Sequence, residues 1–102
     1  MKKYDKLVRD RIPEIIKADG KECVTKVVPK EERAELLERK LMEEVNQYLE
    51  DKNLEELADV MEVLFGLAKN LGYREEELIE KRNEKLEARG GFKEGIVLLE
   101  VK

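Results

Sequence analysis

The chain contains no histidine and only one cysteine, Cys23. The lack of histidine excludes imidazole catalysis and zinc sites that contain histidine. A single cysteine cannot form an internal disulfide, and without a histidine partner it argues against a thiol nucleophile. This cysteine usage fits a reducing compartment, so we expect a cytoplasmic protein.

Long apolar runs and aromatic clusters are also missing. No stretch approaches the roughly 20 apolar residues that span a bilayer, and the first residues do not resemble a signal peptide. Aromatic residues make up 5% of the chain, and we expect Tyr48 and Phe65 to lie in the core rather than to stack on a base. We therefore predict no membrane association and no aromatic platform that would identify a base.

Neither charge sign dominates the 102 residues, which we expect to form one domain over residues 1–102. The 21 basic and 25 acidic side chains give a net charge of -4. Such a balance offers no broad attraction to the phosphates of a nucleic acid polymer or to anionic lipid. An anionic ligand must therefore be bound by a local basic group.

Most of the chain has the pattern of amphipathic helices. Apolar spacing and helix-stop residues predict long helices over about 29–51, 54–71 and 74–89, with a short helix near 13–17. The fold class we predict is mainly α, an antiparallel helical bundle of these three long helices and the short amino-terminal one. The middle helix is apolar over more than half its circumference, so it should be the most buried element.

Two segments at the margins have the composition of strands. Residues 22–28 are rich in β-branched side chains and are followed by Pro29, and residues 96–101 have a similar make-up. An unpaired strand would leave its backbone groups unsatisfied. We therefore expect these two segments to pair as a small two-stranded β element.

Four oxygen-bearing side chains are arranged symmetrically about the break at 51–53. Glu44 and Gln47 precede it, and Glu56 and Asp59 follow at matching distances. If the flanking helices fold back antiparallel, Glu44 comes level with Asp59, and Gln47 with Glu56. Members of each pair are about 4.5 Å apart along the helix axis and lie on neighbouring faces. The pattern predicts a cradle for a hard divalent cation.

Acidic spacing alone is weak evidence in a chain so rich in glutamate. We expect other carboxylates three residues apart to form solvated faces: Glu32 and Glu35, Glu35 and Glu38, Glu77 and Glu80, and Glu84 and Glu87. Glu56 differs because helical spacing places it inside the apolar arc of the middle helix. Burying an unpartnered charge costs several kcal/mol, whereas a bound cation or a basic group offsets that cost.

The last helix supplies positive charge on its apolar stripe. Arg82 and Arg89 are seven residues apart and share one face, with Lys85 on its flank. Two interpretations stay open at this point. The basic side chains bind phosphate beside the carboxylates, or they form salt bridges with the carboxylates of the middle helix.

One combination of segments is more distinctive than any single motif. It joins the run from Tyr4 to Pro13, the pair Glu43 and Glu44, the element from Glu56 to Asp59, and the run from Arg89 to Phe92. The combination resembles the small MazG-type nucleoside triphosphate pyrophosphohydrolases, and more narrowly their phosphoribosyl-ATP pyrophosphohydrolase-like subgroup. The resemblance covers nearly the whole chain. It implies an all-α homodimer or higher homo-oligomer that cleaves a nucleotide between its α and β phosphates with Mg²⁺, for which Mn²⁺ can substitute.

The resemblance also implies a set of metal ligands. They match Glu44, Glu56 and Asp59, and the fourth falls on Gln47, where the pattern usually has glutamate. A glutamine carbonyl can ligate a hard cation, but it brings no negative charge. The departure implies a site with fewer metals or lower affinity, or else an inactive relative.

The expected mechanism is metal-assisted hydrolysis to a monophosphate and pyrophosphate. Glu43 or Glu56 is the candidate proton acceptor for the attacking water. The candidate groups for holding phosphate oxygens are basic side chains: Arg82, Lys85, Arg89, Lys6 and Arg9.

A non-catalytic helical assembly or partner-binding module is the alternative. A small chain with a broad apolar middle helix needs a second subunit to cover it, and a homodimer is compatible with both hypotheses. An assembly module, however, has no need to bury Glu56, Arg82 and Arg89, so the direction of these side chains separates the two.

Overall fold

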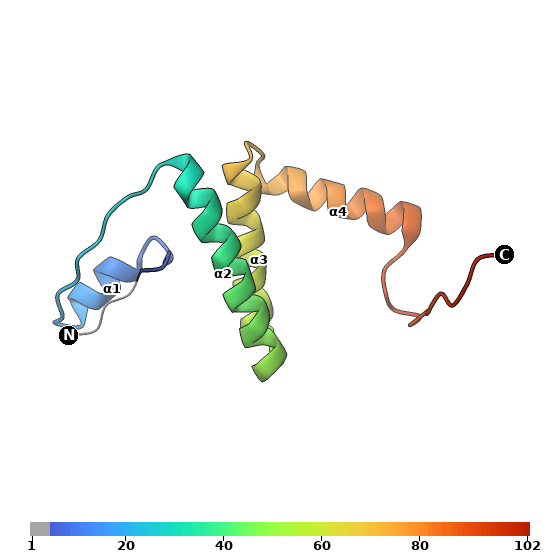
Figure 1. The fold of residues 1–102 in the computed structure, drawn as a ribbon, viewed down its shortest axis with the longest axis horizontal. Coiled ribbons are helices and arrows are strands. Elements are labelled where there is room, and N and C mark those ends of the chain that lie inside the picture. The colour runs from blue at the N-terminus through green and yellow to red at the C-terminus, as the bar shows by residue number, and fades with distance from the viewer. Residues whose placement is uncertain (1–4) are drawn as a thin grey trace.

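The computed structural model describes residues 5–102 and contains four helices (Figure 1). They are α1 (Ile12–Ala18), α2 (Lys30–Asp51), α3 (Leu54–Asn70) and α4 (Glu75–Arg89). The prediction of a mainly α fold is confirmed, and the observed bounds lie within one or two residues of the expected ones. Tyr4, the first residue of the amino-terminal run described above, lies outside the described residues.

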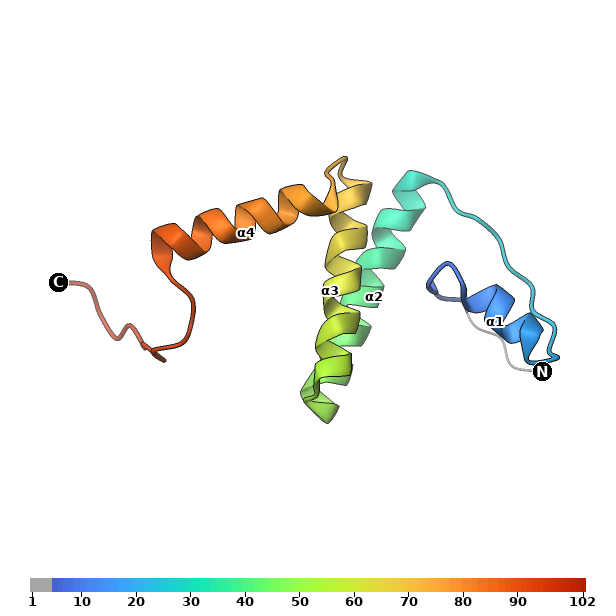
Figure 2. The ribbon, with the colours of Figure 1, turned by 180° about the vertical axis from the view of Figure 1, so that it is seen from behind.

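Helices α2 and α3 form an antiparallel hairpin with a two-residue connection. Lys52 ends α2 in the left-handed backbone region at φ 49°, and Asn53 caps α3 by accepting a hydrogen bond from the Glu56 amide at 2.9 Å. The side chain of asparagine satisfies a backbone donor that the first helical turn leaves open. With so short a turn the two helices lie side by side along their length, as Figures 1 and 2 show.

The hairpin packs through a narrow row of apolar residues. Leu37 on α2 and Val63 and Ala68 on α3 are buried. Gly66 brings the helices close together, because a Cβ atom at that position would lie only 3.1 Å from Leu37 Cδ2. The register of the hairpin, and therefore the height of its polar side chains, is fixed by this contact and by the Asn53 cap.

Helix α4 leaves the hairpin instead of continuing along it. The chain turns at Gly72, whose φ of 98° suits a residue without a Cβ atom, and α4 then points away from α3 (Figure 1). Among the described residues, only the pairs α2 with α3 and α3 with α4 pack against each other. The result is an elongated chain of 61 × 31 × 23 Å.

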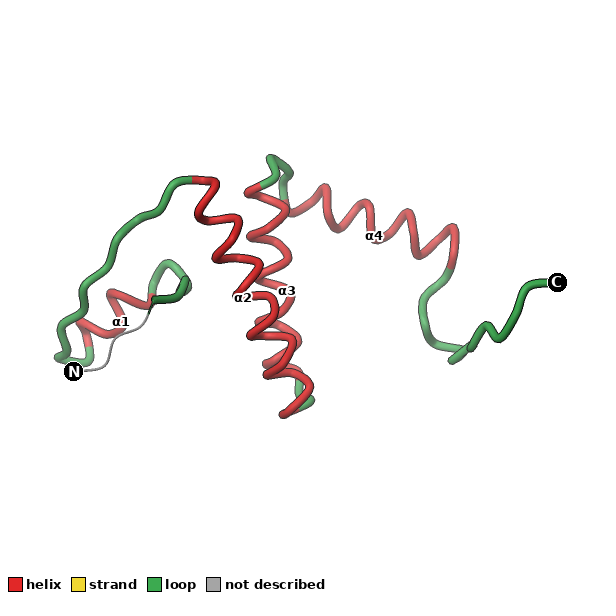
Figure 3. The backbone as a smooth tube through the Cα atoms, viewed as in Figure 1, coloured by secondary structure: helices red, strands yellow, loops and turns green. Residues whose placement is uncertain are grey.

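The predicted two-stranded β element is wrong for the described residues. Residues 22–28 form an extended connection from α1 to α2, whereas residues 96–101 form a tail on the other side of the hairpin (Figure 3). Local composition favours an extended backbone in both segments, but a ladder also requires the segments to meet. The course of α4 carries the second segment away from the first.

Helix α3 contributes two of the buried apolar residues, Val63 and Ala68, but it is covered along one side only and is not the fully buried central element that was predicted. Leu57, Met61 and Leu64 keep between 41% and 54% of their surface exposed. The accessible surface of the chain is 9769 Å², whereas a compact monomer of 12.0 kDa exposes about 6,000 Å². A single chain therefore exposes roughly 3,800 Å² more than a self-sufficient domain of its mass.

Candidate functional site

Three carboxylates from the two hairpin helices converge near the α2–α3 turn. Glu44 on α2 and Glu56 and Asp59 on α3 each offer one oxygen within 4.8 Å of the other two. The side chain of Glu44 is more enclosed than that of Asp59, with 13% exposed against 42%. The structure thus brings together three of the four side chains that the hairpin symmetry predicted, and their role as metal ligands stays a prediction.

The crowding of these carboxylates disturbs the titration of Glu56. Its partial burial raises the pKa above the ordinary value, and the neighbouring charges of Asp59, Asp51 and Glu44 raise it further. Three hard oxygens in one small volume are the donor type that Mg²⁺ and Mn²⁺ prefer. The donor chemistry of the cluster therefore fits a hard divalent cation, which would relieve the repulsion that raises the pKa.

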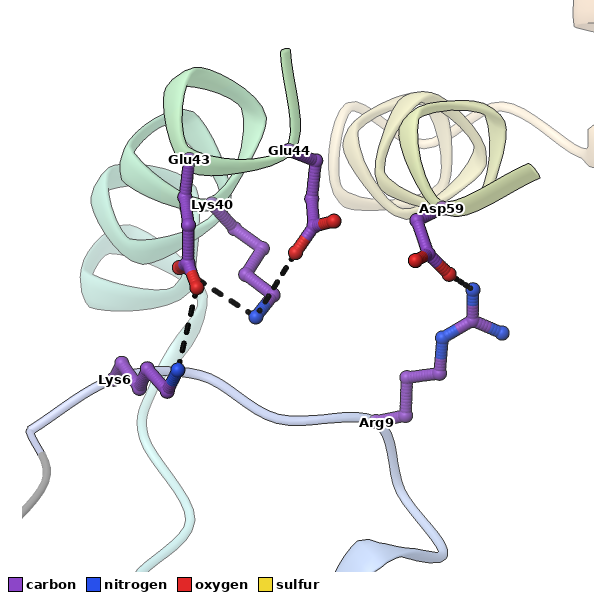
Figure 4. A network of polar contacts seen from close by, with 6 residues as sticks. All are labelled: Lys6, Arg9, Lys40, Glu43, Glu44 and Asp59. Carbon is purple, nitrogen blue, oxygen red and sulfur yellow. Dashed lines mark hydrogen bonds and ion pairs between the residues drawn. The ribbon is translucent and has the colours of Figure 1, made fainter. Parts of the chain in front are cut away.

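Lys40 is a basic neighbour that the sequence prediction did not include. Its Nζ lies 3.4 Å from Glu44 Oε1 and 3.5 Å from Glu43 Oε2, and only 19% of its side chain is exposed (Figure 4). The signal in the sequence was the spacing, because a lysine three and four residues before two glutamates shares their helical face.

The amino-terminal arm, residues 5–11, reaches both helices of the hairpin. Lys6 Nζ lies 3.2 Å from Glu43 Oε1, and Arg9 Nη2 lies 2.7 Å from Asp59 Oδ1 (Figure 4). Partial burial acts to raise the pKa of Glu43, but the hydrogen bond from Lys6 and the charge of Lys40 outweigh it, so the pKa is lowered. Both basic residues predicted for the arm therefore lie beside the acidic cluster.

Gln47 points its amide towards the end of its own helix. Its Nε2 donates a hydrogen bond of 2.6 Å to Asp51 Oδ2. Asp51 is a further acidic neighbour that the sequence prediction missed, and its charge acts on Glu56. The spacing of four residues from Gln47 was the available signal. The fourth predicted ligand position is thus occupied by an amide and carboxylate pair.

The predicted substrate-binding residues of α4 lie away from the cluster of their own chain. Arg82, Lys85 and Arg89 are all exposed, so the expectation that the arginines turn inward is not met within a single chain. The reason is the direction of α4, which starts beyond the far end of α3. About 16 Å of helix separates Asp59 from Asn70, where α3 ends.

Two shallow hollows of the described chain lie away from the carboxylate cluster. Residues of α1 and the loop after it, among them Ile15 and Lys21, line one, and Glu35 and Met42 of α2 belong to the other. None of the four helices combines the length and apolar character that a membrane-spanning segment requires.

Comparisons with protein-family models, with curated proteins and with solved structures gave no match to this chain.

Proposed function

We propose that this chain is a Mg²⁺-dependent nucleotide pyrophosphohydrolase of the MazG type. It would hydrolyse a nucleoside triphosphate or a related nucleotide between the α and β phosphates, giving a monophosphate and pyrophosphate. The observation that carries the proposal is the convergence of Glu44, Glu56 and Asp59 at the hairpin turn. The resemblance of the amino-terminal run and of the Arg89 to Phe92 segment adds to it.

Glu44, Glu56 and Asp59 would hold the cation through one oxygen each. When bound, Mg²⁺ supplies stabilisation of the phosphate oxygens and of the leaving pyrophosphate, and it lowers the pKa of a water. Gln47 adds no charge to this set, so we expect weaker cation binding than four carboxylates would give. Mn²⁺ would serve in place of Mg²⁺ because both prefer oxygen ligands.

Of the two candidate proton acceptors, Glu56 is the better supported. It belongs to the carboxylate cluster that would hold the cation, and because it would ligate through one oxygen, its second oxygen would be left to accept a proton. Glu43 has a lowered pKa because Lys6 donates to it and Lys40 lies beside it. We therefore assign the role of proton acceptor to Glu56. Glu43 instead holds Lys6 and Lys40 in place beside the cluster.

A homodimer or higher homo-oligomer would complete the site. The excess exposed surface is roughly 3,800 Å² per chain, or about 7,600 Å² for two chains, so it is enough for the large interfaces of obligate dimers and exceeds their usual total of about 2,000–5,000 Å². Because α4 projects from the hairpin, a second copy can place its own α4 against the acidic cluster. Arg82, Lys85 and Arg89 would then hold phosphate oxygens across the interface, with the arginines binding in a bidentate manner. We place this activity in the cytoplasm, where Cys23 stays reduced.

The test is to incubate the purified chain with a mixture of nucleoside triphosphates and Mg²⁺ and to identify the products. Monophosphate with pyrophosphate is the expected pair, and it should disappear when Asp59 is replaced by asparagine. Diphosphate with orthophosphate would contradict the proposed bond cleavage. No turnover with any nucleotide under Mg²⁺ or Mn²⁺ would contradict the enzyme assignment.

The second candidate is a non-catalytic helical assembly or partner-binding module. It is favoured by the exposure of Arg82 and Arg89 within the single chain. The ion pairs of Lys40 with Glu44 and of Arg9 with Asp59 also favour it, because they already balance two of the carboxylates. Restoring a carboxylate by Gln47→Glu separates the candidates. A chain that is inactive as found but gains turnover with this substitution is an inactive relative, as the module predicts.

A further inference from the structure

The arm formed by residues 5–11 lies across one side of the acidic cluster. Figure 4 shows it passing both hairpin helices, with Lys6 directed to Glu43 and Arg9 to Asp59. These contacts join segments 37 and 50 residues apart in the chain. One of the two acceptors, Asp59, belongs to the cluster that would hold the cation.

The attachment of the arm depends strongly on charge. Helix α1, which follows the arm, packs against no other helix of the described chain. Within the arm Leu7 is half-buried, whereas Val8 is exposed. The side chains of Arg9 and Asp59 are 54% and 42% exposed, and an ion pair this open to water is weak and is screened by salt. A local change of charge at Asp59 is therefore large enough to remove what this pair contributes to holding the arm, which leaves the Lys6–Glu43 ion pair between the arm and the hairpin.

A divalent cation at the cluster would produce that change. Asp59 Oδ1 lies 2.7 Å from the Arg9 guanidinium, and a cation ligated by the same carboxylate would lie within a few ångströms of it. The two oxygens of a carboxylate can contact both partners, so the conflict is electrostatic rather than steric. Two positive groups then share one negative charge and repel each other.

We propose that the arm is a charge-operated lid on the carboxylate cluster. Without a divalent cation, Arg9 acts as the counter-ion of Asp59 and holds the arm across the cluster. Cation binding weakens this ion pair, the arm undocks, and the freed guanidinium becomes available to the phosphates of an incoming nucleotide. The inference rests on the proposed function and adds a mode of regulation to the same site.

The first measurement is binding of Mn²⁺ alone, followed by the electron paramagnetic resonance signal of the free ion. Arg9→Ala should bind Mn²⁺ roughly two- to fivefold more tightly than the unaltered chain, because the internal competitor is gone. Arg11→Ala is the matched control, since it removes the same charge from the same arm but from a pair with Glu14. It should bind Mn²⁺ as the unaltered chain does.

The second measurement is the rate at which trypsin cuts after Arg9, with cleavage after Arg74 in the α3–α4 connection as internal reference. Mg²⁺ should accelerate cleavage after Arg9 relative to NaCl at equal ionic strength. Asp59→Asn should show the accelerated rate with and without Mg²⁺.

The outcomes separate the two levels of the argument. The lid would be overturned if Arg9→Ala and Arg11→Ala bound Mn²⁺ saturably with equal affinities and Mg²⁺ left the trypsin rate unchanged. The proposed function would still stand in that case. A chain that binds no Mn²⁺ in either form would overturn the proposed function, and the lid with it.

Discussion

At the scale of single residues, the state of the cluster depends on Glu56. Its raised pKa means that the folded chain binds this proton more tightly than the unfolded chain does. The ionised side chain therefore lowers the free energy of unfolding at neutral pH. The penalty is absent below the ordinary pKa of glutamate and is complete above the raised pKa. The partial burial of Glu56, together with repulsion from its carboxylate neighbours, therefore opposes folding in the pH range where the site would work.

Replacing Glu56 by glutamine should uncouple stability from activity. We expect the midpoint of urea unfolding to rise at pH 7 without added metal, and the gain over the unaltered chain to vanish as the pH falls below 4. Turnover should fall by about 10²- to 10⁴-fold because the proton acceptor and one metal ligand are lost. Substantial residual turnover would remove Glu56 from the reacting groups.

Gln47→Glu tests the departure from the pattern of the resembling family. The substitution adds a negative charge one helical turn before Asp51 and beside the carboxylate cluster. It also removes the amide that donates a hydrogen bond to Asp51. We expect Mn²⁺ binding to strengthen roughly tenfold, which corresponds to about 1.4 kcal/mol. Gln47→Met, which removes the same hydrogen bond without adding charge, is the control. Equal affinities in the two variants would show that position 47 does not face the cation.

At the scale of elements, the hairpin sets the geometry of the site because the three carboxylates come from both of its helices. Its contact at Gly66 leaves little space, with Leu37 Cδ2 3.1 Å from the position of a Cβ atom. Gly66→Leu should force α2 and α3 apart, destabilise the chain by about 1–3 kcal/mol and weaken Mn²⁺ binding.

Gly66→Ala is the milder comparison for this prediction. Its gain in helix propensity, up to about 1 kcal/mol, opposes the close contact with Leu37. Urea unfolding and Mn²⁺ titration of both variants check the idea. Full cation affinity in a destabilised Gly66→Leu chain would show that the cluster does not depend on the helix spacing.

The helices and the carboxylate cluster could be predicted from the sequence because their determinants are local. Apolar periodicity, the Asn53 cap and the symmetry about the turn all act within a few residues. The strands could not be judged in the same way, since pairing of 22–28 with 96–101 depends on where α4 sends the tail. The contacts of Lys6 and Arg9 were equally hidden, because their acceptors are 37 and 50 residues away.

At the scale of the whole molecule, one chain leaves much apolar surface uncovered. Besides α3, the tail exposes apolar side chains such as Leu99, which is 89% exposed. Such surface is unfavourable in water, so we expect sedimentation equilibrium to give at least twice the chain mass of 12.0 kDa. A monomer at micromolar concentration would contradict the proposed interface.

Mixing two inactive variants would show whether the site is shared between copies. One variant carries Glu56→Gln, and the other carries alanine at positions 82, 85 and 89. If α4 acts across the interface, the remixed sample should regain about a quarter of the unaltered activity. About half of the dimers are then mixed, and each mixed dimer has one intact site out of two. If α4 acts within its own chain, remixing restores nothing.

The most direct measurement is anomalous X-ray diffraction from a crystal of the unaltered chain grown with Mn²⁺. We predict a manganese peak within about 2.3 Å of oxygen atoms from all three cluster carboxylates, Glu44, Glu56 and Asp59. Two results would contradict the account. Manganese could bind only at other positions, or the cluster could hold no manganese while Glu44 still pairs with Lys40 and Asp59 with Arg9.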